Sequence, residues 1–184
     1  MPTTETRDTA PAIGSAARWG PLWGARPADW ALSEDQQIPT YRAALERVGL
    51  EPGQAVLDAG CGVGAFLRLA ADRGARVFGI DASHELLDLA RRRLPGADLR
   101  VGDIEALPYD DNSFDLVTGF NSFFFANDIV AAAGEAGRVA KLGTFCRFRG
   151  LFGERWAEAA EAEHAECDQR FGGVKPVCAA GDHA

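Results

Sequence analysis

Apolar and polar residues alternate in blocks over residues 55–149, and each block has the length of a strand or of a helix. Short apolar runs predict buried strands, whereas apolar residues spaced three and four apart predict helices. The predicted strands are residues 55–59, 76–80, 98–101, 114–120 and 144–149. The predicted helices are residues 37–48, which precede the first strand, and residues 64–73, 84–93 and 127–140.

Strands that alternate with helices predict a parallel sheet with right-handed crossovers. The predicted fold class is therefore α/β, with a Rossmann-like, mostly parallel sheet flanked by helices. The first four strands end at Gly60, Asp81, Asp103 and Phe120. Because ligands of such sheets bind outside the carboxyl ends of the strands, we expect these four residues to line one cleft.

Changes in composition along the chain predict four regions. Residues 1–17 should be a disordered N-terminus, because Thr, Ala and Pro dominate there. Residues 18–54 should form an aromatic-rich cap that ends in a helix. Residues 55–150 should form the Rossmann-like cofactor-binding domain, and residues 151–184 a diverged C-terminal tail with one helix.

Three tryptophans stand out in the predicted cap. Trp19, Trp23 and Trp30 lie among glycines and prolines, a composition that predicts a poor helix over residues 18–34. Their large apolar rings either pack on a neighbouring core or form a lid over a ligand. Both arrangements are compatible with the sequence.

The most specific motif is Asp58-Ala-Gly60-Cys-Gly62-Val-Gly64, between the first predicted strand and the helix after it. A glycine turn in this position lets backbone N–H groups approach a ligand closely. Asp81, at the end of the second strand, can accept both hydroxyls of a ribose that lies beside the turn. Asp103 and the backbone N–H of Ile104 could recognise an adenine edge. Each of these two acids could instead be an ordinary turn residue.

Two nucleoside cofactors fit a glycine turn followed by a ribose-binding acid. NAD fits because Gly60, Gly62 and Ala65 satisfy the looser form of the dinucleotide fingerprint. S-adenosylmethionine fits better, because Asp58 could serve its ammonium group but would repel a pyrophosphate. Asp103 adds an adenine contact that favours the same cofactor.

Four motifs in this order resemble the class I S-adenosylmethionine-dependent methyltransferases, over roughly residues 37–141. The resemblance is to the small-molecule branch with ubiquinone- and menaquinone-biosynthesis-like enzymes. The motifs are Asp58 to Gly64, Gly79-Ile-Asp81-Ala-Ser83, Gly102-Asp103-Ile-Glu-Ala-Leu-Pro-Tyr109 and Ser113-Phe-Asp-Leu-Val117.

The resemblance implies a cofactor site with a role for each matching residue. Asp58, Gly60 and Gly62 would surround the methionine moiety, and Asp81 would hold the ribose. Ala82 would flank the adenine, whose amino edge would face Asp103 and Ile104. Phe120 and Asn121 would lie beside the sulfonium. No catalytic base is assigned, and His84 is expected at the surface.

The chain departs from the family pattern after the fourth strand. Gly134 and Gly137 lie inside the predicted helix, and each costs about 1 kcal/mol relative to alanine. No sixth or seventh strand is recognised, so the sheet should lack the last two strands of the family. A truncated or diverged C-terminus would explain this pattern.

Charge and cysteine usage restrict the partners and the cellular location. The 19 Lys and Arg residues against 27 Asp and Glu give a net charge of −8, which argues against a nucleic-acid partner. No apolar stretch reaches the ~20 residues of a membrane span. The four cysteines form no metal-binding pattern with the three histidines, so no metal is expected and a cytoplasmic location is predicted.

The predicted function is methyl transfer from S-adenosylmethionine to a small-molecule acceptor. A catalytically impaired methyltransferase-fold remnant or interaction module is the alternative, and an NAD(P)-dependent oxidoreductase is a further one. The sequence carries no code for the acceptor or for the oligomeric state.

Overall fold

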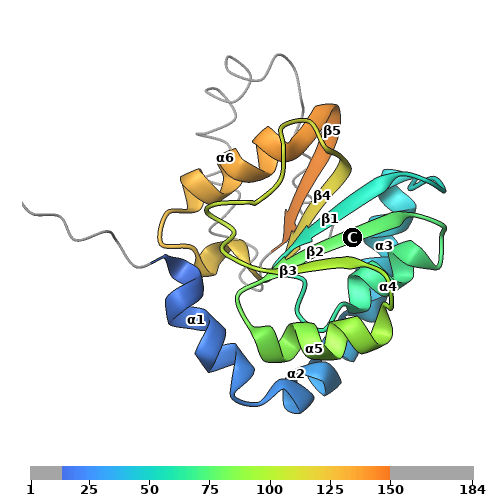
Figure 1. Ribbon diagram of the computed structural model, residues 1–184. Coiled ribbons are helices and arrows are strands. Elements are labelled where there is room, and N and C mark those ends of the chain that lie inside the picture. Colours follow the sequence, from blue (N-terminus) through green and yellow to red (C-terminus); the bar gives the residue numbers. More distant parts are fainter. Residues whose placement is uncertain (1–13, 150–184) are drawn as a thin grey trace, which may run out of the picture.

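Residues 14–149 form a five-stranded parallel sheet flanked by helices (Figure 1), which confirms the predicted fold class. The computed structural model describes residues 14–149, with side chains for residues 14–141. The strands are β1 Ala55–Ala59, β2 Arg76–Asp81, β3 Asp98–Val101, β4 Phe114–Phe120 and β5 Ala140–Arg149. Their order in the sheet is β3-β2-β1-β4-β5, and every neighbouring pair is parallel.

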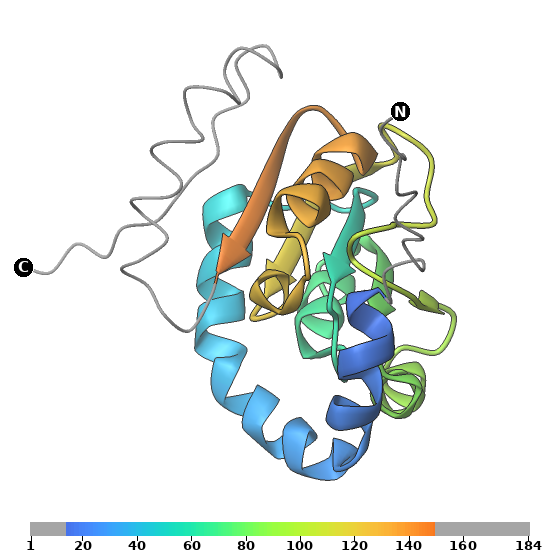
Figure 2. The same cartoon turned by 90° about the vertical axis from the view of Figure 1, so that its left-hand side faces the viewer.

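Helices cover both faces of this sheet (Figures 1 and 2). One face carries α3 Ile38–Val48, α4 Ala65–Ala71 and α5 His84–Arg93. The other face carries α6 Ile129–Val139. Two short 3-10 helices, η1 Asp35–Gln37 and η2 Phe123–Phe125, lie between longer elements.

The apolar residues of β1 divide between two cores because successive side chains of a strand point to opposite faces. Val56 packs with α3, α4 and α5. Ala55 and Leu57 pack with α6 on the other face. Both faces of this central strand are therefore buried, which explains why its sequence is continuously apolar up to Asp58.

The N-terminal segment differs from the sequence-based expectation. Residues 18–34 were expected to be poor helix, but they lie almost entirely in α1 Ser15–Gly24 and α2 Pro27–Glu34. Pro21 lies inside α1 and removes one backbone donor. The local sequence disfavours these two helices, and the packing of their tryptophan rings against one another and against Phe125 stabilises them. The helical start at Ser15 also shortens the predicted disordered segment, whose first thirteen residues lie outside the described part.

The carboxyl half of the fold follows the prediction up to β5. The predicted strand 144–149 is part of a longer strand that begins at Ala140, directly after α6, and pairs with β4. The predicted tail over residues 151–184 lies outside the described residues. None of the helices in residues 14–149 is long and apolar enough to cross a membrane.

Replacement of Gly134 by alanine should raise the free energy of unfolding by about 0.5–1 kcal/mol. Gly134 lies within α6, and a Cβ built on it meets no other atom within 4 Å. Alanine therefore restricts the unfolded chain and favours the helix without a clash. Urea unfolding monitored by circular dichroism measures the change. A lower midpoint would contradict the described environment of this residue.

Candidate functional site

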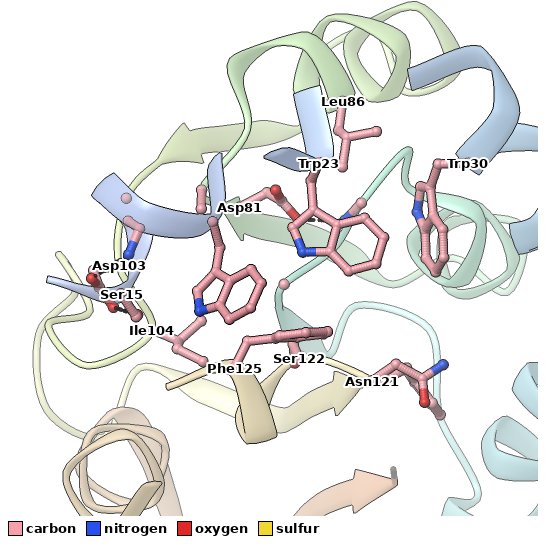
Figure 3. A pocket seen from close by; sticks show the side chains of 17 residues that line it. Ser15, Trp23, Trp30, Asp81, Leu86, Asp103, Ile104, Asn121, Ser122 and Phe125 are labelled. Carbon is pink, nitrogen blue, oxygen red and sulfur yellow. Dashed lines mark hydrogen bonds between the residues drawn. The ribbon is translucent and has the colours of Figure 1, made fainter. Parts of the chain in front are cut away.

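A cleft opens at the carboxyl ends of the strands, where the sheet order reverses between β1 and β4 (Figure 3). Its volume is about 590 Å³, including space open to solvent. Eight of the nine sequence-predicted cofactor residues line it: Gly60, Gly62, Asp81, Ala82, Asp103, Ile104, Phe120 and Asn121. These residues come from four loops that are far apart in sequence.

The glycine turn after β1 has a backbone that side chains rarely allow. Gly60 and Gly62 have φ angles of 84° and 54°, in the left-handed region. A Cβ at Gly60 would overlap the Cβ of Ser122, and a Cβ at Gly62 would lie 2.9 Å from Nε1 of Trp30. Glycine is therefore required here both by the conformation and by close neighbours.

Asp81 connects the end of β2 to the glycine turn. Its Oδ2 accepts the backbone N–H of Gly62 and its Oδ1 accepts that of Ser83, both at 2.8 Å. Burial raises the pKa of Asp81, and backbone hydrogen bonds from Ser83, Gly62 and Ala82 oppose the rise. An ionised carboxylate has about four acceptor positions, so acceptor capacity remains for a ribose hydroxyl.

Asp103, at the end of β3, is engaged by the N-terminus of α1. Its Oδ1 accepts the hydroxyl of Ser15 at 2.6 Å and the N–H of Glu105 at 3.0 Å, while its Oδ2 accepts the N–H of Ala16 at 2.8 Å. Although burial acts to raise it, these hydrogen bonds hold the pKa of Asp103 below its usual value. One acceptor position remains, on Oδ2, which is sufficient for one amino hydrogen of an adenine.

Asp58 is the predicted residue that the structure does not bring to the cleft. It is fully buried beneath the glycine turn, where its Oδ1 accepts the hydroxyl of Thr118 at 2.8 Å. Burial raises the pKa of Asp58 to about 7, and the negative charge of Asp81 adds to the rise. Its side chain is therefore engaged within the protein and lies outside the cleft lining. The direct ligand contact that the family resemblance implies stays a prediction.

A third carboxylate lies at the same turn, and no sequence motif predicted it. Glu34, the last residue of α2, is 3% exposed. Burial raises the pKa of Glu34 to about 8, and the nearby Asp58 adds to this rise. The glycine turn is thus surrounded by buried acidic groups of Glu34, Asp58 and Asp81. Such surroundings favour a cation and oppose a pyrophosphate.

Aromatic rings from both ends of the fold form one wall of the cleft (Figure 3). Trp23 contacts Trp30 edge to face, with ring centroids 4.9 Å apart. Phe125 of η2 contacts Trp19 at 4.9 Å and Trp23 at 5.3 Å. The tryptophans were expected either to pack on a neighbouring core or to form a lid over a ligand, and the structure places their rings in the lining of the cleft.

The end of β4 contributes backbone strain to the site. Asn121 has a φ angle of 56°, one of the two positive values among the described residues other than glycine. Asparagine tolerates this conformation better than most residues. The sharp turn at Asn121 brings Ser122 back to donate its hydroxyl to the carbonyl of Ala59 at 2.6 Å. The strained turn therefore joins β4 to the glycine turn across the switch point of the sheet.

The described residues contain no group of His, Cys, Asp and Glu side chains that could hold a metal ion. His84 lies on α5 with its side chain 66% exposed, beside Asp88 at 3.3 Å. It stands outside the cleft lining. The chemistry of the cleft therefore rests on carboxylates, backbone groups and aromatic rings.

Comparison with known proteins supports the interpretation of this cleft. The family model described as "Methyltransferase domain" matches residues 57–148, half of the chain. A malonyl-[acyl-carrier protein] O-methyltransferase of Serratia marcescens is 32% identical over 139 residues, covering 72% of this chain and 54% of the relative. A demethylmenaquinone methyltransferase of Renibacterium salmoninarum is 39% identical over 112 residues, covering 61% and 47%. The chain spans about half the length of these curated relatives.

Solved structures share the same fold. A complex of the Haloferax volcanii Trm112 methyltransferase activator with a methyltransferase matches with a TM-score of 0.67 and 31% identity. That match covers 82% of this chain and 73% of the other. The cyclase SpnF matches with a TM-score of 0.52 and 31% identity over 56% of this chain and 40% of the other. With the glycine turn, the strand-end acids and the family match in agreement, the chain belongs to the class I S-adenosylmethionine-dependent methyltransferases.

Proposed function

We propose that the chain binds S-adenosylmethionine in this cleft and methylates a small-molecule acceptor. The observation that supports the proposal best is the set of buried carboxylates around the glycine turn, Glu34, Asp58 and Asp81. S-adenosylmethionine carries a sulfonium and an ammonium against one carboxylate, and such a cation suits acidic surroundings. A cation favours the ionised forms of these acids, whose pKa values burial raises, whereas a pyrophosphate disfavours them. An oxidoreductase is therefore the weaker alternative.

Each end of the adenosyl group has a partner under this proposal. Asp81 would accept the ribose hydroxyls with the acceptor capacity that its backbone hydrogen bonds leave free. Asp103 would accept the adenine amino group, between Ala82 and Ile104. Phe120 and Asn121 would lie on the side where the acceptor enters.

When bound, S-adenosylmethionine supplies an electrophilic methyl group. The residues of the chain contribute position and exclusion of water, which can supply a large part of the rate of a displacement. The wall of Trp19, Trp23 and Phe125 favours an acceptor with an apolar group. The relatives act on a malonyl-acyl-carrier protein and on demethylmenaquinone, so these two acceptors are the first to test.

The proposal predicts binding of S-adenosylhomocysteine, the product form of the cofactor, with a Kd of about 1–100 µM. Calorimetric titration of the 184-residue chain measures this affinity directly, and circular dichroism verifies that the sample is folded. NADH is the matched control ligand, and no change in its fluorescence is expected. A folded chain that binds NADH but not S-adenosylhomocysteine would favour the oxidoreductase instead.

A methyltransferase-fold remnant makes a different prediction for turnover. Such a protein would bind S-adenosylhomocysteine but form none of it from S-adenosylmethionine with any acceptor. Chromatographic detection of S-adenosylhomocysteine, with and without each candidate acceptor, separates this alternative from an active enzyme. Acceptor-dependent product would establish methyl transfer by this chain.

A further inference from the structure

We propose that Glu34 and Trp30 of α2 hold the amino-acid tail of the cofactor, an inference that rests on the proposed function. The Glu34 carboxylate would accept hydrogen bonds from the ammonium group of the tail. The indole N–H of Trp30 would donate to its carboxylate. No motif in the sequence assigns either residue this role.

The first observation is that both side chains carry an unused polar atom. Over the described residues, Nε1 of Trp30 and Oε2 of Glu34 are the two buried side-chain polar atoms without a hydrogen-bond partner. Buried polar groups in folded proteins almost always have a partner, and an orphan calls for an explanation such as an absent ligand. One orphan is a donor and the other an acceptor, so a single zwitterionic group would satisfy both.

The second observation is that both side chains reach the glycine turn. Nε1 of Trp30 lies 2.9 Å from the position of a Cβ on Gly62, and Oε1 of Glu34 lies 3.4 Å from the same position. Trp30 (Figure 3) and Gly62 line the cleft. Glu34 is not part of the lining, but its carboxyl group approaches Gly62. A ligand seated against Gly62 is therefore within reach of both side chains.

The third observation is the order of the strands along the cleft. β3, β2 and β1 are consecutive neighbours, so Asp103, Asp81 and the glycine turn follow one another along the edge of the sheet. An adenine at Asp103 and a ribose at Asp81 place the remaining part of the cofactor at the glycine turn. That part is the sulfonium with its amino-acid tail.

Charge supports the same assignment. The negative charges of Asp58 in β1 and Asp35 in η1 raise the pKa of Glu34. Two further titratable groups lie near Glu34, Tyr41 of α3 and Cys61 of the glycine turn. The opposing cation is Arg93 of α5, whose Nη1 is 3.7 Å from Oε2 of Glu34, too far for a hydrogen bond. The ammonium group of a ligand would supply the missing cation.

A purely structural role for Glu34 is the competing explanation. The backbone N–H of Ala65, at the start of α4, also donates to its carboxyl group, and Arg93 pairs with Asp35 at 3.8 Å as well as with Glu34. A residue that only supports α4 would affect every ligand of the cleft equally. A residue that holds the tail would affect only ligands that have the tail.

The test compares S-adenosylhomocysteine with 5′-methylthioadenosine, which lacks the amino-acid tail. Glu34→Gln should weaken S-adenosylhomocysteine binding about 10–100-fold, the range for loss of a charged hydrogen bond. It should leave the affinity for 5′-methylthioadenosine within about twofold. Trp30→Phe, which keeps the ring and removes the donor, should weaken only S-adenosylhomocysteine, by about 3–10-fold. Glu46→Gln, on the exposed side of α3, is the charge-matched control and should change neither affinity.

Proton release gives an independent readout. Because burial and Asp58 raise the pKa of Glu34 to about 8, its carboxyl group is mostly protonated in the free protein at pH 7. Pairing with an ammonium favours the ionised form, so binding should release a proton. Titrations in two buffers with different ionisation enthalpies measure the released protons. In Glu34→Gln the release should fall to the part that Asp58, with its pKa raised to about 7, contributes.

The outcomes separate the two proposals. If the folded wild-type chain binds neither ligand, the proposed function fails and this inference fails with it. If it binds both ligands and Glu34→Gln weakens them equally or leaves both unchanged, the inference alone is overturned. Should Glu34→Gln prove unstable in thermal unfolding, Trp30→Phe decides the question with the same pair of ligands.

Discussion

Replacement of Asp81 by alanine is expected to weaken the binding of S-adenosylhomocysteine by at least about 100-fold. The substitution removes the carboxylate proposed to accept two ribose hydroxyls, and each charged hydrogen bond contributes about 1.5–3 kcal/mol. It also leaves the buried N–H groups of Gly62 and Ser83 without their acceptor. The free energy of unfolding should therefore fall by about 2–4 kcal/mol. Calorimetric titration and urea unfolding measure the two effects.

Two control variants separate these effects from a general loss of fold. Asp81→Asn keeps one acceptor oxygen and should lie between wild type and alanine in both measurements. Asp72→Ala breaks the exposed ion pair with Arg68 and should change stability by less than about 1 kcal/mol, with no effect on affinity. Unchanged affinity in a folded Asp81→Ala protein would exclude the assigned ribose contact.

Replacement of Gly60 by alanine should be the most disruptive change in the glycine turn. Gly60 and Gly96 have similar φ angles of 84° and 92°, but a Cβ on Gly96 meets no atom within 4 Å, whereas one on Gly60 overlaps the Cβ of Ser122. The left-handed conformation alone costs alanine about 1–2 kcal/mol. Gly96→Ala should therefore lose about that amount of stability, and Gly60→Ala about 1–3 kcal/mol more.

The comparison of the two variants isolates the contact between the glycine turn and the end of β4. S-adenosylhomocysteine affinity should fall in Gly60→Ala, because the turn and Ser122 must move apart, and should not change in Gly96→Ala. Equal losses of unfolding free energy in the two proteins would show that the close contact between Ser122 and the glycine turn does not add to the cost of the Gly60 substitution. Chemical unfolding and calorimetry on the same samples provide both numbers.

Local patterns were sufficient for the strands and helices after residue 37. β3, β4 and α5 have the predicted boundaries, because apolar periodicity and the capping residue Ser83 act over only a few residues. The N-terminal helices were not predicted, because Pro21 and several glycines oppose helix locally. Contacts of Phe125 with Trp19 and Trp23 join segments that are about a hundred residues apart, and such contacts leave no local pattern.

The candidate site divides in the same way. Asp81 and the glycines could be recognised because a turn between strand and helix has strict local requirements. Asp58 belongs to the same sequence motif, yet its carboxyl group accepts a hydrogen bond from Thr118 of the neighbouring strand β4 and does not line the cleft. No sequence motif marked Glu34, because its place beside the glycine turn depends on tertiary burial near Gly62 and Asp58.

The sequence by itself therefore determined the parallel sheet, its cofactor cleft and the family of the protein, since these follow from short-range periodicity and from glycine conformations. Only the tertiary structure decided which carboxylates face the cleft and which are buried beside it. It also decided that the tryptophans of α1 and α2 form a wall of the cleft. The reason is physical: burial, desolvation and unpaired polar atoms are properties of residues brought together from distant parts of the chain.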